Sequence, residues 1–140
     1  MSILKWFSIT DRHIKKYLDL HLAPYGINSS QHLYILKICD QPGITQERLI
    51  EDYYIHPSNV TRALNTLEEK GYVRRESCEE DKRKWKLYPM DKAWDLQKEI
   101  IRVKKEAEAE LLKGFTVQEQ RDFSELLKKA GKNAIFNIPL

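Results

Sequence analysis

Residues 57–75 read PSNVTRALNTLEEKGYVRR and carry the clearest fold signal in the chain. Proline is favoured at the first position of a helix, because the amide hydrogen that it lacks would have no partner there. Apolar side chains then recur at helical spacing, at Val60, Leu64 and Leu67. Gly71 supplies a helix end, and a short strand candidate begins at Tyr72. The stretch predicts a helix with one buried side, followed directly by a strand.

The other side of this helix is polar and cationic in its first turns. The residues on it are Pro57, Ser58, Asn59, Thr61, Arg62 and Asn65. Arginine can pair with guanine through two hydrogen bonds, asparagine can pair with adenine in the same way, and a threonine methyl can pack against thymine. The first acids, Glu68 and Glu69, lie at the far end of the helix. These residue types predict a recognition helix for the major groove of duplex DNA.

The neighbouring segments extend this prediction to a winged helix-turn-helix. A helix is expected from Thr45, as its N-cap, to Tyr53, and residues 54–56 form a tight turn before the recognition helix. Strand candidates at 72–76 and 85–88 flank a polar loop, which predicts a hairpin with a charged tip. Two short helices joined by a tight turn and followed by a basic hairpin are typical of this motif.

The hairpin carries most of its cations at the tip. The residues predicted to contact DNA from it are Arg75, Lys82, Arg83, Lys84 and Lys86, with Asp81 among them. Such a wing can straddle the phosphates and insert one arginine into the minor groove. Asp81 can hold Arg83 extended through a salt bridge. Glu79 and Glu80 partly cancel the cations and mildly favour a different use of the domain, in protein contact.

Helices are expected on both sides of this middle part. One spans residues 2–22, and the Pro and Gly within residues 23–26 end it. A second starts near Asn28, with a buried stripe of Leu33, Leu36 and Cys39. A long helix from Asp91 to about Leu112 has an apolar seam close to a heptad repeat, and Thr116 with Glu119 forms a capping box for a last helix. The apolar face of that helix holds Phe123, Leu126, Leu127 and Ala130.

The predicted class is therefore mainly α with a small β-hairpin wing, a winged helix-turn-helix with flanking dimerisation helices. The expected parts are an N-terminal dimerisation helix at 1–27, a DNA-binding domain at 28–89 and C-terminal dimerisation helices at 90–140. A chain of 140 residues, 41% hydrophobic and 32% charged, is long enough for one packed core. A net charge of +3 permits binding to nucleic acid without requiring it.

The composition and motifs also argue against several classes of protein. Two cysteines without a CxxC pair indicate reduced thiols rather than a disulfide framework. The sequence has neither a signal peptide nor a membrane span, so we expect a cytoplasmic protein, associated with the nucleoid. It has no Ser/His/Asp set, glycine-rich phosphate loop or paired acids in an apolar setting. We therefore expect no enzyme activity, no cofactor and no metal site.

Three motifs resemble a known family. Residues 43–49 (GITQERL) and 57–75, together with Asp81-Lys82-Arg83, resemble the core and the Asp-x-Arg wing signature of the MarR family. The resemblance implies a homodimer in which the first and the last two helices of both chains interlock. It implies Arg83 in the minor groove, Asp81 as its orienting partner and the helix from Pro57 in the major groove.

The resemblance also implies a function. It predicts a sequence-specific, ligand-responsive repressor that binds a pseudo-palindromic operator as a homodimer. Its partners would be duplex DNA, a second copy of the chain and a small aromatic or phenolic ligand between the dimerisation and DNA-binding parts. Candidate pocket residues, offering aromatic walls and hydrogen bonds, are Tyr17, His21, Tyr34 and Trp94.

Some positions depart from the family pattern, and some readings stay open. Where many members have Leu-Thr-x-x-Gly after the second wing strand, this chain has residues 89–93, PMDKA, so Asp91 is expected to cap the long helix. A redox role for Cys78 and a metal role for the N-terminal histidines are minor alternatives. The alternative function is a winged-helix protein-interaction module or antirepressor without its own operator. A PadR-like regulator is a further DNA-binding alternative.

Overall fold

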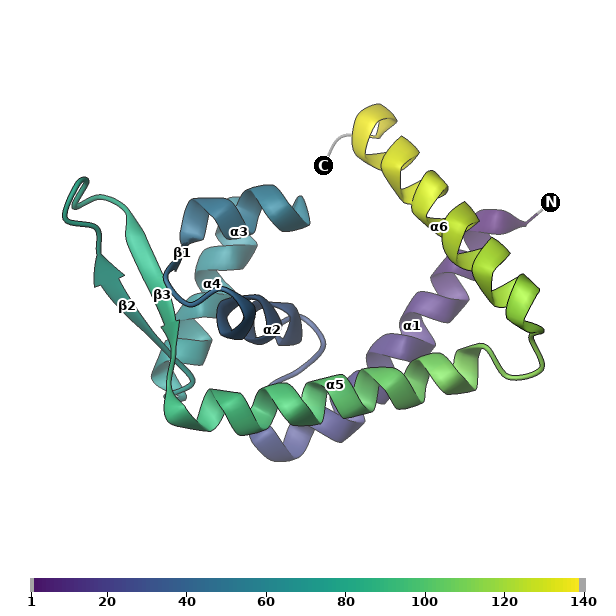
Figure 1. Ribbon diagram of the computed structural model, residues 1–140, viewed down its shortest axis with the longest axis horizontal. Coiled ribbons are helices and arrows are strands. Elements are labelled where there is room, and N and C mark those ends of the chain that lie inside the picture. Colours follow the sequence, from purple (N-terminus) through teal and green to yellow (C-terminus); the bar gives the residue numbers. More distant parts are fainter. Residues whose placement is uncertain (1, 139–140) are drawn as a thin grey trace.

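The computed structural model describes residues 2–138, so Met1 and residues 139–140, at the outer ends of the expected parts, lie outside it. The elements in chain order are α1 (Ile3–Leu22), the 3₁₀ turn η1 (Ala23–Tyr25), α2 (His32–Asp40), β1 (Ile44–Thr45), α3 (Gln46–Tyr53), α4 (Pro57–Glu69), β2 (Val73–Ser77), β3 (Trp85–Pro89), α5 (Asp91–Leu111) and α6 (Val117–Asn137). Figure 1 shows the winged part at one end and α1 and α6 at the other. The predicted class, mainly helical with a small β wing, is confirmed.

The sheet has three antiparallel strands in the order β1-β3-β2. The predicted hairpin of β2 and β3 is present, with Arg75 opposite Leu87. The third strand, β1, was not predicted, and it pairs Ile44 with Leu87. Two residues are too few to show the alternation that identifies a strand in a sequence. The pairing attaches the wing to the residues that precede α3.

The core lies inside the winged part and extends along the first half of α5. The predicted buried side of α4 is confirmed, because Val60, Leu64 and Leu67 are each 0% exposed. The predicted stripe of α2 is wrong in part: Leu33 and Leu36 are only half-buried, whereas Ile35 and Ile38 are fully buried. This helix packs against both α5 and β3, so the buried face is wider and turned relative to a single stripe.

One predicted helix start and one predicted N-cap are also wrong, whereas the predicted start of α5 at Asp91 is confirmed. The second helix begins at His32 rather than near Asn28, because residues 28–31 form a turn in which Asn28 Oδ1 accepts from the amide of Ser30. The amide of Asn28 donates to Gln31 Oε1, so the side chains at this turn bond locally instead of extending the helix. The N-cap of α5 is Met90 without a side-chain hydrogen bond, and Asp91 is the first helical residue rather than the cap.

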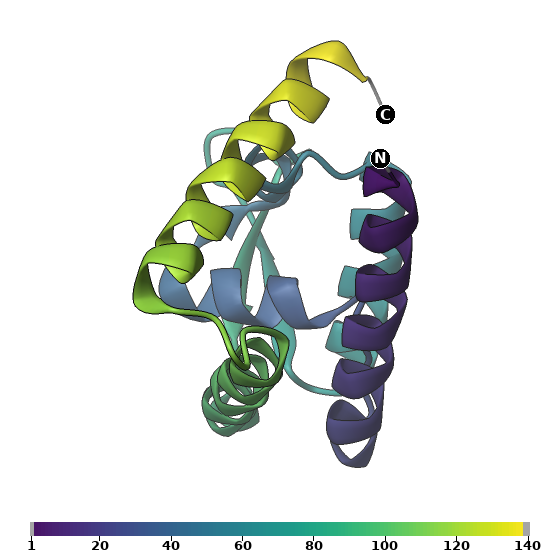
Figure 2. The ribbon, with the colours of Figure 1, turned by 90° about the vertical axis from the view of Figure 1, so that its right-hand side faces the viewer.

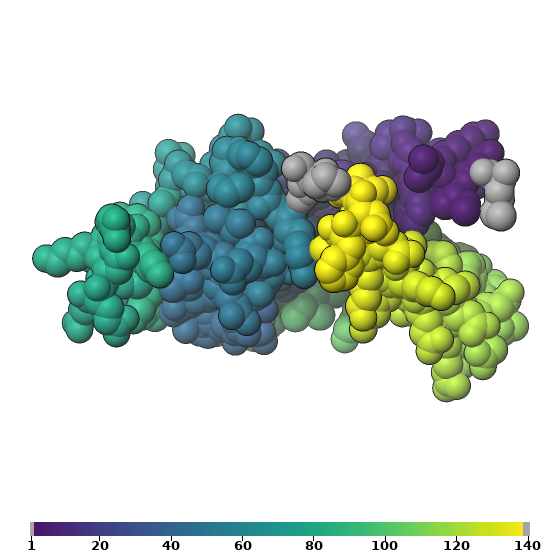
Figure 3. All heavy atoms as spheres, turned by 90° about the horizontal axis from the view of Figure 1, so that it is seen from above, coloured from purple at the N-terminus to yellow at the C-terminus, as the bar shows by residue number. Residues whose placement is uncertain are grey.

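The outer helices form arms rather than a closed layer. Figure 2 looks along α5 and shows α1 and α6 on different sides of it, and Figure 3 shows both at the end opposite to the wing. The capping box predicted for α6 is confirmed, with Thr116 Oγ1 accepting from the amide of Glu119 at 3.1 Å. None of the described residues of α6 is buried. No helix within residues 2–138 has the length and apolar character needed to span a bilayer.

Candidate nucleic-acid interface

The turn between α3 and α4 fixes the direction of the second helix. Tyr54 ends α3 with a positive φ of 53°, and its amide donates to the carbonyl of Ile50. The N-cap of α4 is His56, whose Nδ1 accepts from the amide of Ser58 at 3.2 Å, and Pro57 follows as the first helical residue. Sequence reasoning missed His56, because histidine is not among the usual N-cap residues.

The structure brings the six predicted residues of α4 together on one solvent-facing side. Those residues are Pro57, Ser58, Asn59, Thr61, Arg62 and Asn65, and all are exposed. Within the described residues, the side chains of Asn59 and Arg62 take part in no hydrogen bond or ion pair. Their donors and acceptors are therefore available to an outside partner.

Other polar groups on this side are already engaged. The hydroxyl of Thr61 donates to the carbonyl of Pro57 at 3.1 Å and accepts from Gln46 Nε2 of α3 at 2.9 Å. Since a hydroxyl has one hydrogen to donate, Thr61 offers a partner its methyl group and no donor. The hydroxyl of Ser58 bonds to His56 Nδ1 at 2.7 Å. Gln46 was not predicted, since nothing in its local sequence indicates a contact with residue 61.

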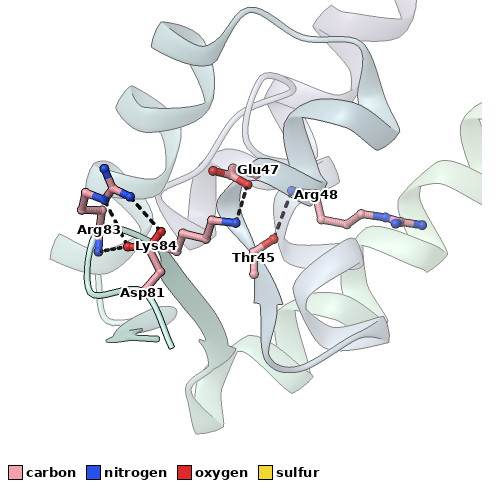
Figure 4. Close-up of polar contacts among 6 residues, drawn as sticks. All are labelled: Thr45, Glu47, Arg48, Asp81, Arg83 and Lys84. Carbon is pink, nitrogen blue, oxygen red and sulfur yellow. Dashed lines mark hydrogen bonds and ion pairs between the residues drawn. The ribbon is translucent and has the colours of Figure 1, made fainter. Parts of the chain in front are cut away.

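At the wing tip, Asp81 clamps Arg83 through its carboxylate (Figure 4). Its Oδ1 accepts from the backbone amide of Arg83 at 3.0 Å and from Nε at 3.2 Å, and Oδ2 accepts from Nη2 at 3.4 Å. These hydrogen bonds, the side-chain ones first, lower the pKa of the Asp81 carboxyl. The ion pair predicted from the sequence is present, and it leaves the Arg83 side chain 91% exposed.

A second ion pair joins the wing to α3. Lys84 Nζ lies 3.4 Å from Glu47 Oε2, and Figure 4 shows this side chain reaching from the wing to the start of α3. Lys82 is exposed and Lys86 is half-buried on β3. Glu47 was not predicted as part of the site. The pair, together with the β1–β3 pairing, makes the wing and the helix pair one structural unit.

Arg75 differs from the other wing cations. Its side chain is 16% exposed, its Nε donates to Glu68 Oε2 at 2.7 Å, and its Nη2 donates to Asn65 Oδ1. Both partners lie on α4, so Arg75 braces β2 against that helix. The sequence alone gave Arg75 the same expected role as the cations at the tip.

The four candidate pocket residues occupy three separate surroundings. The rings of Tyr17 and His21 on α1 have centroids 4.3 Å apart, and Tyr17 Oη donates to Glu106 of α5 at 3.2 Å. Partial burial and then this bond raise the pKa of Tyr17. Tyr34 is buried, and Trp94 is 40% exposed on α5.

Two hollows on the described surface are lined by other residues than these four. One is a groove of about 830 Å³ between α1, α5 and α6, and the other, of about 170 Å³, lies between α3 and the wing.

Both cysteines and one histidine, His32, are buried, whereas His13 and His56 are exposed. Burial raises the pKa of the Cys39 thiol to about 11, and Cys78 is also buried. His32 is 7% exposed, its Nδ1 lies 2.5 Å from the carbonyl oxygen of Ser29, and burial lowers its pKa. Residues 2–138 hold no group of three or more His, Cys, Asp or Glu placed to bind a metal ion.

This geometry defines the class: a helix pair with a three-residue turn, an exposed polar second helix and a cationic antiparallel hairpin form a winged helix-turn-helix. The sequence model of the MarR family matches residues 27–85. An uncharacterized HTH-type transcriptional regulator of Bacillus subtilis, YybA, is 28% identical over 132 residues, which are 94% of this chain and 88% of the relative.

Solved structures give the same result. A MarR protein from Peptoclostridium difficile superposes with a TM-score of 0.92 at 25% identity, covering 96% of this chain and 88% of its own. A putative MarR family regulator from Listeria monocytogenes, solved in complex with a 26mer DNA, superposes with a TM-score of 0.88 at 28% identity, covering 96% and 89%. Over residues 27–85 the chain resembles the MarR family of transcriptional regulators, and its fold is the winged helix-turn-helix of these solved relatives.

Proposed function

We propose that this chain is a transcriptional regulator that binds a pseudo-palindromic duplex operator as a homodimer and represses transcription from it. In this proposal α4 reads bases in the major groove, and Arg83 of the wing enters the minor groove beside it. One observation carries the proposal: the exposed polar side of α4, with Asn59 and Arg62 free among the described residues, and the extended Arg83 belong to one structural unit, joined by the β1–β3 pairing and the Glu47–Lys84 pair.

The dimensions and chemistry of α4 suit a major groove. The groove is about 12 Å wide and admits one helix, whose diameter with side chains is about 10–12 Å. Arg62 and Asn59 have no competing partner among the described residues, so pairing with bases breaks no existing contact. Thr61 would contribute its methyl group, which suits contact with thymine. Pro57, Ser58 and Asn65 complete the proposed reading surface.

The wing suits a narrow, strongly negative minor groove. Asp81 fixes both the backbone and the guanidinium of Arg83, which lowers the entropy lost when that side chain is inserted. Lys82, Lys84 and Lys86 would contact phosphates and give the affinity a dependence on salt. Glu79 and Glu80 oppose this attraction, so we expect moderate rather than strong affinity for unrelated sequences.

The proposed dimer rests on the outer helices. A capped helix of 21 residues with no described residue buried needs a partner surface, because tertiary packing supplies most of the stability of a helix. The apolar side chains left exposed on α6 are large: Phe123, Leu126, Leu127, Ile135 and Phe136. Trp6 and Phe7 of α1 are also exposed. Covering these groups with a second chain is the proposed role of residues 1–27 and 90–140, while residues 28–89 would bind DNA.

A two-fold dimer presents its two reading helices to two half-sites of opposite orientation. The half-sites of such proteins lie about 34 Å apart, one turn of B-DNA, or a multiple of it. The Listeria relative, bound to a 26mer DNA, supports binding to a duplex of this length scale. This operator symmetry is the reason for the pseudo-palindrome in the proposal.

We also propose that a small aromatic or phenolic ligand relieves repression. Tyr17 and His21 are the best supported candidates, because their rings lie against each other at a tilt of 41° where α1 meets α5. Tyr34, which is buried on α2, and Trp94, which is 40% exposed on α5, are the other two candidates for this ligand site. A ligand shifts the dimer away from DNA only to the extent that it binds one spacing of the reading helices better than the other.

The test is binding of the purified chain to duplexes from the DNA flanking its own gene, at two stated salt concentrations. We expect tight binding to one duplex, weaker binding to a scrambled duplex of equal length, and release by a phenolic acid added in steps. The exposed acids at the wing tip favour a second candidate, a protein-interaction module or antirepressor. Equal, weak binding to all duplexes would support that candidate and contradict the operator.

A further inference from the structure

We propose that Arg75 sets the base preference of Asn65, so that Asn65 selects guanine rather than adenine. The inference rests on the proposed function, since it concerns which base the same reading helix accepts. It starts from the contact between Arg75 Nη2 and Asn65 Oδ1, which joins β2 to the exposed side of α4. Arg75 thereby becomes a positioning residue, one that acts on DNA through a neighbour.

The identity of the atoms in this contact follows from their chemistry. A guanidinium has donors and no acceptor, so the Asn65 atom that faces it is the amide oxygen and not the amide nitrogen. Arg75 is held in place from the other side by Glu68, whose Oε2 accepts from Nε at 2.7 Å. The Arg75 side chain is 16% exposed, so it has little freedom to turn away. The Asn65 oxygen is therefore directed at β2.

The other end of the amide is free. Within residues 2–138, Nδ2 of Asn65 donates no hydrogen bond, and the side chain is exposed. Asn65 lies seven residues after Ser58 and three after Arg62, so it shares their face of α4. What Asn65 offers DNA from that face is an amino group with two hydrogens to donate.

A donor selects among the four bases. Adenine pairs with asparagine through both ends of the amide, because N6 donates to the oxygen while N7 accepts from the nitrogen. Turning both ends of Asn65 toward one base would take the oxygen from Arg75 and leave a largely buried cation with one partner fewer, which is costly. Guanine presents two acceptors, O6 and N7, and cytosine presents only a donor. Guanine is thus the favoured base at the pair that faces Asn65, and cytosine is the least favoured.

The experiment selects bound sequences from a pool of duplexes with randomised half-sites, using the purified full-length chain. Asn65→Ala identifies the pair in question as the position whose preference disappears. At that pair the unaltered protein should favour guanine over adenine at least about fivefold. Arg75→Met keeps the aliphatic stem but removes the donor, and it should reduce this ratio to about twofold or less, without change at the other positions. Glu68→Gln is the matched control and should keep the ratio.

Several results would overturn the inference. One is a preference for adenine at the Asn65 pair in the unaltered protein, or no change of preference in Asn65→Ala. Another is an equal loss of affinity for every sequence in Arg75→Met with a flatter salt dependence, which identifies Arg75 as a phosphate contact.

A further variant covers the case in which Arg75→Met fails to fold, which its thermal midpoint would reveal. Asn65→Asp keeps an acceptor for Arg75 and offers DNA acceptors only, so the pair should change to cytosine. An unchanged preference there contradicts the inference. If the unaltered protein selects no sequence at all, the proposed function fails as well. If it selects sequences that depend on Arg62 but not on Asn65, only this inference fails.

Discussion

The winged part and the outer helices α1 and α6 differ in where their apolar side chains are buried. From α2 to β3 most apolar residues are buried within one chain, with Ile35, Leu64 and Leu87 each 0% exposed, although Tyr54 and Trp85 are exposed. On α6 the apolar residues are exposed, with Leu126 64% and Phe136 84% exposed. Both segments have well-formed helices with side-chain caps at Thr45 and Thr116. A regular, capped helix is therefore no sign that its apolar face has found a partner within the same chain.

This difference separates two tasks. The winged part has its packing complete, so its exposed side is polar and free to meet a ligand of polar character such as DNA. The apolar side chains of the outer helices are still exposed in a single chain. In the proposed function, a second copy of the chain covers them. The following predictions test this division, from the largest expected effect to the smallest.

The largest effect is expected on α6. Leu126→Asp places a charge where the proposed dimer buries an apolar side chain, and the symmetry of a dimer doubles the loss. At about 1.5–3 kcal/mol for each buried side chain, the dimer should weaken by roughly 3–6 kcal/mol. Analytical ultracentrifugation should find monomers at micromolar concentration. Lys132→Glu also adds a carboxylate to this helix but removes no apolar side chain, so it is the control and should stay dimeric. A dimer that survives Leu126→Asp unchanged contradicts the role of α6.

A smaller loss is expected in the core of the winged part. Leu64→Ala leaves a cavity beneath α4 and should lower the free energy of unfolding by about 2–5 kcal/mol. Denaturant unfolding measures this loss, and it should be similar at low and high protein concentration. A Leu64→Ala effect that vanishes on dilution would mean that the winged part depends on dimerisation for its packing.

On the reading surface, Arg62→Ala should reduce affinity for the operator by about 1–3 kcal/mol and relax the preference at one base pair. Arg83→Ala should weaken binding and flatten its salt dependence, because a minor-groove cation is lost. Titrations on the selected duplex at several salt concentrations separate the two. Equal loss on all sequences in Arg62→Ala would assign that side chain to phosphate, and unchanged binding in Arg83→Ala would remove the wing from the site.

The smallest effects are expected from removing the N-cap side chains of α6 and α3. Thr116→Ala removes the capping box of α6, and Thr45→Ala removes the cap of α3, each worth about 1 kcal/mol. We expect Thr116→Ala to weaken dimerisation, with little effect on DNA binding by dimers already formed. We expect Thr45→Ala to lower unfolding stability instead. Both variants should be measured for dimer affinity and for the free energy of unfolding. If the two outcomes were exchanged, the separate roles of the outer helices and the winged part would be contradicted.

Much of this fold could be predicted from the sequence because its signals are local. Pro57 with the apolar spacing of Val60 and Leu64 indicates α4, and Thr116 with Glu119 indicates the start of α6. What could not be predicted depends on contacts between distant segments. The two-residue strand β1 exists only through pairing with β3, and the buried face of α2 is set by α5 and β3 together.

The same holds for the site. Residues 57–65 share a helix face, so their common exposure follows from spacing alone. Arg75 and Arg83 both look like wing cations in the sequence, yet the first is held by α4 and the second extends from the tip. Charge patterning records the type of side chain and not its partner, and this is why Glu47, Gln46 and His56 were not predicted as supports of the interface.

The most direct test of the account is genome-wide footprinting of the purified protein, with the bound half-sites aligned. A dimer that reads its operator through α4 should protect two half-sites of opposite orientation, about one helical turn apart from centre to centre or a multiple of that spacing. Arg62→Ala should lose the protection at specific sites. Protection of single, unpaired sites, or the same pattern from the Arg62→Ala protein, would contradict the claim that a dimer reads its operator through α4.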